Sequence, residues 1–150
     1  MPNPPRVPDL PKALTDRVAF LLQLALARVQ ALGERALAEL GLSGREYGTL
    51  AVLEGGSPDA QHRVGAALGV DRTSTVKLLA GLEGRGLVSR VRDPSNRRAY
   101  RVTLTDVGEA LRAHAAAVLE DCDDRFLASL PADERAQLRV ILLRLLEPVR

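Results

Sequence analysis

The stretch DRTSTVK at residues 71–77 decides the fold, because a helix start and two cations coincide there. Asp71 has the side chain of a good N-cap, which accepts a hydrogen bond from a backbone N–H of the first helical turn. The apolar residues that follow recur at helical spacing as far as Leu82, and Gly84 or Gly86 then ends the pattern. The sequence therefore predicts a helix that begins after Asp71 and stops at one of these glycines.

This predicted helix has two different faces. Its apolar positions, which we expect to point toward a core, are Val76, Leu79 and Leu82. The side chains that remain for solvent or a ligand are Arg72, Thr73, Ser74 and Lys77. The first turns of the helix therefore expose small hydroxyls and cations.

A β-hairpin is predicted directly downstream of this helix. Residues 87–92 (LVSRVR) and 100–104 (YRVTL) alternate apolar and polar side chains, as strands with one buried face do. They flank residues 93–98 (DPSNRR), where Asp, Pro, Ser and Asn favour a turn. The pattern predicts a basic hairpin.

Upstream of Asp71, the sequence predicts a second short helix. It spans about residues 59–68, with Val64, Ala67 and Leu68 facing inward, and a Gly69-Val70 turn follows it. Two short helices joined by a tight glycine turn are typical of a helix-turn-helix. In that arrangement the second helix lies in the major groove of DNA, and its first residues touch base edges.

Positive charge is concentrated in the same region. Residues 61–101 contain nine Lys or Arg against three acids, a net charge of +6, whereas the whole chain carries only +2. Such an asymmetry is expected where a protein meets the phosphate backbone. The hairpin would be the wing of a winged helix, and Arg97 and Arg98 at its tip are long enough to enter a minor groove.

The start of the chain predicts an arm and a long helix. Five prolines in residues 1–11 predict an extended arm, because proline blocks helix propagation. Residues 12–40 carry a wide apolar stripe at helical spacing, which we expect to be buried on more than one side. Ser43 and Glu46 have the spacing of a capping box that starts the next helix.

The end of the chain predicts two more helices. One runs from Thr105 to about Leu130, and Pro131 suits the first turn of the last helix. The apolar residues of these helices and of residues 12–40 exceed what a small DNA-binding lobe needs for its core. Since such a stripe must be buried, the sequence predicts a helical homodimer interface.

Composition narrows the class of protein. A chain of 150 residues with 46% hydrophobic and 27% charged residues suits one globular domain. Its apolar residues are mainly Leu, Ala and Val, with two Phe, two Tyr and no Trp, which favours helices over aromatic-rich sheets. Cys122 is the single cysteine, so no intrachain disulfide forms. We find no signal peptide or membrane span and expect a cytoplasmic protein that does not bind membranes. The predicted fold is mainly α, with a winged helix-turn-helix lobe and a helical dimerisation region.

Several local phrases resemble the MarR family of winged-helix transcriptional regulators, named for multiple antibiotic resistance. They are Leu42-Ser43 leading into Tyr47 and Leu50, residues 69–76 (GVDRTSTV), residues 82–88 (LEGRGLV), residues 93–99 (DPSNRRA), and Leu104-Thr105 with Gly108. The resemblance covers nearly everything from residue 12 to residue 147. Gly65 stands where the family more commonly has alanine, and glycine costs about 1 kcal/mol inside a helix.

The resemblance implies one domain at residues 12–150, with a DNA-binding lobe at about 43–104 and dimerisation helices at about 12–40 and 105–147. It implies a homodimer that binds pseudo-palindromic operator DNA and represses nearby genes, and small aromatic or phenolic ligands that relieve binding. Contacts of the recognition helix would fall on Arg72, Thr73, Ser74, Thr75 and Lys77. Contacts of the wing would fall on Arg90, Arg97 and Arg98.

An effector pocket is expected where three predicted helices converge: the helix at residues 12–40, the helix that starts after Ser43, and the helix from Thr105 to about Leu130. Its predicted residues are Leu21, Ala25, Tyr47, Leu50, Leu111 and His114. His114 could instead be an ordinary core histidine. Cys122 could be either a small buried hydrophobic residue or a redox sensor.

No residue pattern indicates an enzyme. We find no nucleophile with an adjacent base, no phosphate-binding glycine loop and no cysteine-histidine metal pattern, and the sequence predicts no metal and no cofactor. The acids at positions 120, 121, 123 and 124 favour a solvated helix face over a metal site. Our interpretation is a sequence-specific transcriptional regulator. The alternatives are a winged-helix module that binds an acidic protein partner, or, more remotely, a carrier or enzyme for a small molecule.

Overall fold

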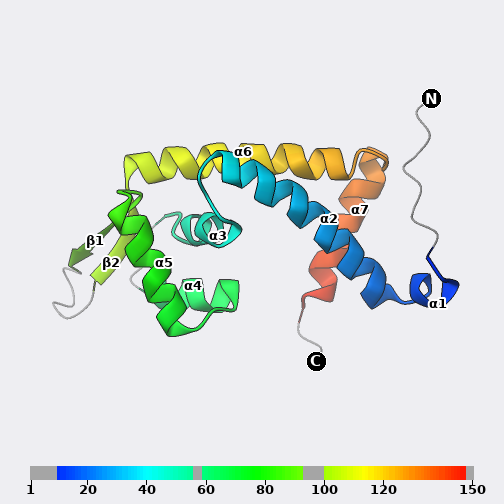
Figure 1. The fold of residues 1–150 in the computed structure, drawn as a ribbon, viewed down its shortest axis with the longest axis horizontal. Helices are drawn as coiled ribbons and strands as arrows, with labels where there is room; N and C mark the ends of the chain where they lie inside the picture. The colour runs from blue at the N-terminus through cyan, green and yellow to red at the C-terminus, as the bar shows by residue number, and fades with distance from the viewer. Residues whose placement is uncertain (1–9, 56–58, 93–99, 148–150) are drawn as a thin grey trace. The chain divides into compact units, whose positions relative to one another are not determined.

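The structure is a computed structural model that describes residues 10–55, 59–92 and 100–147. Its elements in chain order are α1 (Lys12–Thr15), α2 (Val18–Glu39), α3 (Gly44–Val52), α4 (Ala60–Leu68), α5 (Arg72–Gly84), β1 (Val88–Arg92), β2 (Tyr100–Leu104), α6 (Asp106–Phe126) and α7 (Ala132–Leu145) (Figure 1). β1 and β2 pair antiparallel, with Val88 opposite Leu104 and Arg92 opposite Tyr100. The predicted class, mainly helical with one hairpin, is confirmed.

The chain divides into two compact units. The terminal unit comprises Met1–Ala31 and Asp121–Arg150, and the central unit comprises Leu32–Glu120. The lobe predicted at residues 43–104 lies inside the central unit, which also contains the end of α2 and most of α6. None of the helices in the described ranges has both the length and the apolar character that a bilayer crossing requires.

Two predicted helix starts are confirmed by their hydrogen bonds. The Ser43 hydroxyl accepts a bond from the Glu46 N–H at 3.2 Å, while the Ser43 N–H donates to the Glu46 carboxylate at 2.8 Å. This is the predicted capping box, and α3 follows it. Asp71 caps α5 in the same way, since its carboxylate accepts a bond from the Ser74 N–H at 2.9 Å.

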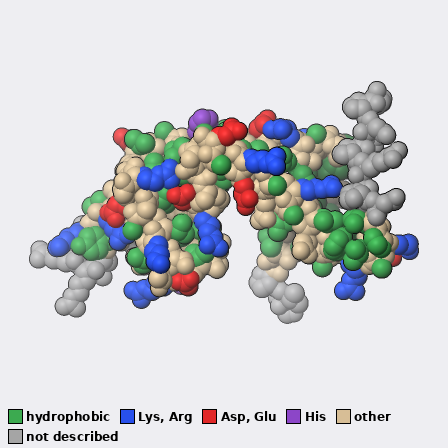
Figure 2. All heavy atoms as spheres, viewed as in Figure 1, with side chains coloured by type: hydrophobic (Ala, Val, Ile, Leu, Met, Phe, Trp, Pro, Cys, Tyr) green, Lys and Arg blue, Asp and Glu red, His purple; other side chains and the backbone are tan. Residues whose placement is uncertain are grey.

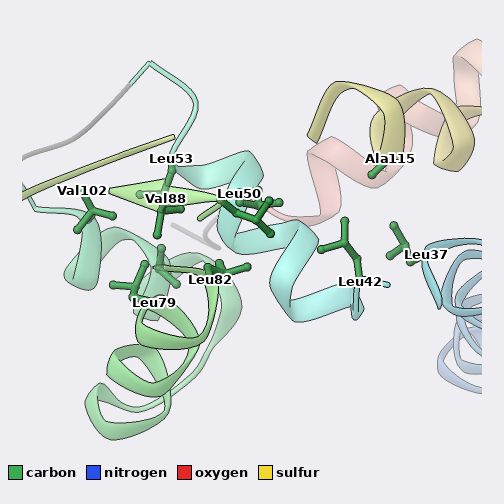
Figure 3. Close-up of a cluster of buried hydrophobic side chains, with 12 residues drawn as sticks. Leu37, Leu42, Leu50, Leu53, Leu79, Leu82, Val88, Val102 and Ala115 are labelled. Carbon is green, nitrogen blue, oxygen red and sulfur yellow. The ribbon is translucent and has the colours of Figure 1, made fainter. Parts of the chain in front are cut away.

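The core of the central unit lies between α3, α4, α5 and the hairpin (Figure 3). Leu50, Val64, Leu79 and Leu82 are completely buried there. Two inward positions were predicted wrongly, because Val76 and Ala67 are exposed whereas Thr75 and Ala60 are buried. The Thr75 hydroxyl donates to the Asp71 carbonyl at 3.0 Å, so its burial leaves no unsatisfied donor.

The helix predicted at residues 12–40 is interrupted. Asp16 and Arg17 separate α1 from α2, and the Arg17 carbonyl accepts the first bonds of α2. The prediction that its apolar stripe is buried is wrong for the start of α2, where Val18 is 68% exposed. Leu21, Leu22 and Leu26 are exposed as well. Nothing in the described part of the chain covers these four side chains.

The junction between β2 and α6 explains the Leu104-Thr105 phrase with its glycine. The Thr105 hydroxyl donates to the Gly86 carbonyl at 2.7 Å and accepts a bond from the Gly108 N–H at 3.0 Å. The first turn of α6 therefore lies directly against residues 86–87. A Cβ atom at Gly108 would overlap the Leu87 carbonyl, so glycine is required there.

Arg85, the C-cap residue of α5, connects this helix to α3 and to the segment between α2 and α3. One guanidinium nitrogen donates to the Glu46 carboxylate and the other to the Gly41 carbonyl, both at 2.9 Å. Partial burial raises the pKa of Glu46, but the hydrogen bonds from Ser43 and the charge and hydrogen bond of Arg85 outweigh burial and hold the pKa below its usual value. These contacts fix the end of α5 against the α2–α3 junction.

Close packing explains why a glycine occupies position 65 inside α4. A Cβ atom at this position would lie 3.2 Å from the Val70 carbonyl oxygen and 3.5 Å from the Thr75 hydroxyl. The turn into α5 therefore passes close over this residue, and the missing methyl group leaves room for it.

Candidate nucleic-acid interface

The start of α5 is rigid and uncovered. Both the backbone N–H and the hydroxyl of Ser74 donate to the Asp71 carboxylate, at 2.9 and 2.7 Å, and these bonds lower the pKa of Asp71. The side chains of Arg72, Thr73 and Lys77 are exposed and have no hydrogen bond or ion pair with any described residue. Their donors are therefore available to a ligand.

Two other residues of the predicted recognition set are engaged inside the protein. The Thr75 side chain is completely buried, so the prediction that it contacts DNA is corrected by this structure. Adjacent helical positions differ by about 100° in direction, and α5 turns residue 75, rather than 76, toward the core. Ser74 is half-buried, and its hydroxyl proton is used in capping α5.

The described part of the hairpin is tied to α5. Nε of Arg90 lies 3.0 Å from Oε2 of Glu83 in an ion pair, although its N–H does not point along the line of a hydrogen bond. The Arg90 side chain is only 28% exposed. It therefore orients the hairpin rather than extending freely from it. The predicted wing contacts Arg97 and Arg98 lie outside the described residues.

Cationic side chains lie along the central unit where α4 and α5 are found (Figure 2). The exposed ones in these two helices include Arg63, Arg72 and Lys77. On the hairpin, Arg92 is also exposed. This surface carries the excess positive charge that the sequence indicated.

A recess of about 660 Å³ opens beside the start of α5. Its floor contains the buried side chains of Ala60, Thr75 and Val102. Its polar edge is formed by Asp59, Gln61, His62, Arg72, Arg90 and Tyr100. No sequence pattern indicates a site at Gln61, His62 or Tyr100, because only the folded chain brings α4, α5 and β2 together.

The residues predicted for an effector pocket lie in both units. Leu21 is exposed and Ala25 half-buried in the terminal unit. In the central unit, Tyr47 and Leu111 are half-buried, Leu50 is completely buried and His114 is exposed on α6. The interpretation of His114 as a core histidine is therefore wrong. None of the six residues lines the recess, and their pocket stays a prediction.

Two other predictions can be compared with the structure. Cys122 is 4% exposed, which confirms it as a small buried residue of α6. Near the predicted acidic face, Asp121 pairs with Arg125, and Asp124 with Arg135. Among the described residues, no three His, Cys, Asp or Glu side chains lie close enough together to hold a metal ion.

The chain is similar along most of its length to proteins of one known family. The sequence model of the MarR family matches residues 40–99. A transcriptional regulator of the MarR family from Rhodococcus sp. RHA1 is similar with a TM-score of 0.80 and 32% identity, over 93% of this chain and 99% of that one.

Two structures of a repressor called CouR are also similar. CouR from Rhodococcus jostii RHA1 bound to p-coumaroyl-CoA has a TM-score of 0.79 and 32% identity, over 93% of this chain and 99% of that one. CouR bound to a 23-mer DNA duplex has a TM-score of 0.78 and 31% identity, over 88% of this chain and 94% of that one.

Proposed function

Because the chain belongs to the MarR family of transcriptional regulators, and is therefore a DNA-binding regulator rather than an enzyme, we propose that it is a homodimeric repressor of nearby genes. In this proposal it binds a pseudo-palindromic operator, and a small aromatic ligand releases it. The observation that carries the proposal is the capped start of α5, whose exposed Arg72, Thr73 and Lys77 have no partner among the described residues.

The proposed DNA contacts follow from this exposure. Arg72 is suited to a bidentate bond with the O6 and N7 atoms of guanine, while Thr73 and Lys77 reach a neighbouring base edge or phosphate. We propose further that Arg97 and Arg98 enter the adjacent minor groove. Thr75 is left out because it is buried, and Arg90 acts by holding the hairpin to Glu83.

Homodimerisation is supported by the uncovered apolar residues of the terminal unit. A group of hydrophobic side chains lies at α1 and the start of α2 (Figure 2). Exposed fractions reach 54% at Leu26 in α2 and 57% at Leu143 in α7. A second copy that covers both helices would bury this surface, at about 25 cal/mol per Å² of apolar area. We propose α1, α2, α6 and α7 as the dimerisation region.

A small-molecule effector is supported by the ligand of CouR. p-Coumaroyl-CoA, bound in that structure, is an aromatic thioester. We propose that an aromatic ligand binds this chain beside Tyr47 and His114, two of the predicted pocket residues in the central unit, and lowers its affinity for DNA. The test is a change in melting temperature with a panel of aromatic acids and their CoA thioesters. A shift that persists in both His114→Ala and Tyr47→Phe variants would exclude this pocket.

The experiment that tests the whole proposal is selection of genomic DNA fragments by the purified protein at about 150 mM salt, where non-specific binding is weak. Recovery of an inverted repeat with half-sites about 10 base pairs apart supports a dimeric regulator. Recovery of no enriched sequence contradicts the proposal and favours the alternative, a winged-helix module for an acidic protein partner.

A further inference from the structure

The recess lies between the two elements that we assign to DNA. One side is the start of α5, with Arg72, and the other is the hairpin, with Tyr100. Between them the floor consists of small or buried residues, among them Gly65 and Ala66 of α4. A floor without long side chains allows another molecule to approach the backbone of α4 closely.

Three polar groups at the edge of this floor have no internal role. Gln61 and His62 are exposed in the first turn of α4, and Tyr100 is 51% exposed at the first position of β2. Within the described ranges, none of their side chains makes a hydrogen bond or ion pair. A tyrosine hydroxyl, an imidazole and a carboxamide therefore border one concave surface with free donors.

The geometry of the duplex indicates what crosses this surface. With α5 in a major groove and the wing in the adjacent minor groove, the sugar–phosphate strand that separates the grooves must lie between the two elements. We propose that the recess binds this strand. The Tyr100 hydroxyl and the polar hydrogens of Gln61 and His62 donate to phosphodiester oxygens, and a deoxyribose packs on the floor. This inference rests on the proposed function and assigns contacts to residues outside the recognition helix and the wing tip.

One acidic residue at the edge allows a test in which the substitution should raise the affinity for DNA rather than lower it. Asp59 lines the recess and precedes α4, but its side chain makes no capping bond. Its carboxylate would repel a phosphate. Since asparagine keeps its shape and leaves no cap unmade, Asp59→Asn should bind DNA about threefold more tightly.

The experiment is a phosphate-neutralisation scan of the selected operator. Single methylphosphonates remove one charge at a time along the strand that separates the grooves, and the affinity of each duplex is measured for the wild-type protein and for Tyr100→Phe, His62→Ala and Asp59→Asn. On the unmodified operator we expect Tyr100→Phe to weaken binding about tenfold, the usual effect of losing one hydrogen bond to a charged group. The control is Arg45→Ala, which removes a full charge from α3, outside the recess.

The scan distinguishes a phosphate contact from a general disturbance. If Tyr100 bonds a phosphate, the Tyr100→Phe effect disappears on the one or two duplexes in which that phosphate is neutral, whereas the effect of Arg45→Ala is the same on all of them. An equal loss at every position, or wild-type affinity in both Tyr100→Phe and His62→Ala, overturns the inference while the proposed function stands. Failure of the wild-type protein to prefer the operator over random DNA overturns both.

Discussion

Replacement of Arg85 by alanine should destabilise the central unit measurably, because this side chain satisfies two acceptors at once. Its bonds to the Glu46 carboxylate and the Gly41 carbonyl are both 2.9 Å long. Loss of the guanidinium leaves the carbonyl without its partner and the carboxylate without its counter-charge. The two partners are 39 and 44 residues away in sequence, so the substitution also removes a long-range connection between α5 and the α2–α3 junction.

The expected magnitude follows from these two bonds. A hydrogen bond to a charged group contributes about 1.5–3 kcal/mol, but 39% of the Arg85 side chain is exposed, so solvent screening reduces this to about 1 kcal/mol. The bond to the carbonyl adds about 1 kcal/mol. We therefore expect Arg85→Ala to lower the free energy of unfolding by about 2 kcal/mol at neutral pH.

The effect should depend on pH with a definite sign. Arg85 and Ser43 hold the pKa of Glu46 below its usual value, so the Glu46 contribution is complete above that value, near 4.5, and is lost as the pH falls through the lower pKa of the folded state. The difference between wild type and Arg85→Ala should therefore shrink as the pH is lowered from 7 toward 3. The part due to the Gly41 carbonyl should remain.

The assay is urea unfolding at one fixed protein concentration, for wild type, Arg85→Ala, Glu46→Gln and the double variant. The matched control is Arg63→Ala, which removes the same side chain from an exposed site in α4 with no partner among the described residues; it should change the free energy by less than about 0.5 kcal/mol. A loss in Arg85→Ala no larger than in this control, or a coupling energy with Glu46 that does not change with pH, would refute the reasoning.

Four further predictions follow from the fold and the proposed interface. Gly108→Ala forces a methyl group into a backbone carbonyl and should cost about 1–3 kcal/mol, measured by urea unfolding against Gly44→Ala, where a Cβ meets nothing within 4 Å. Leu22→Glu places a charge on the exposed stripe of α2 and should convert a dimer to a monomer in sedimentation experiments; an unchanged mass would exclude this face from the interface. Arg72→Ala should cost about 1–3 kcal/mol on the operator and relax preference at one base pair, whereas a uniform loss on all sequences contradicts base readout. Replacement of both Arg97 and Arg98 by alanine should weaken binding to every sequence and reduce its salt dependence, and an unchanged slope of affinity against salt would remove the wing from the interface.

Local sequence signals predicted the elements well, since each signal acts over a few residues. The Ser43–Glu46 capping box and the Asp71 cap join residues three positions apart, and their hydrogen bonds form within one turn. The hairpin strands, at Val88–Arg92 and Tyr100–Leu104, follow from the alternation of apolar and polar side chains. Such patterns fix where a helix or strand begins and ends before any distant contact forms.

The sequence did not predict correctly which side chains of α5 point toward the core. Periodicity placed Val76 inward as the more apolar side chain, but α5 turns Thr75 toward the core, and the bond from its hydroxyl to the Asp71 carbonyl of the preceding turn satisfies its donor there. A threonine satisfied in this way enters a core without an unpaired donor. Hydrophobicity alone does not distinguish this case from an exposed threonine.

The sequence by itself determined the order and type of the elements, the helix caps and the basic character of residues 61–101. Tertiary structure decided which charges stay free, since Arg85 and Arg90 find Glu46 and Glu83 only after the chain folds, while Arg72 and Lys77 find no partner in the described residues. It also created the recess, in which Gln61, His62 and Tyr100 meet from elements up to 39 positions apart. The physical reason is range: caps and periodicity arise from bonds within one or two turns, whereas ion pairs and concave surfaces need segments that only the packed core brings together.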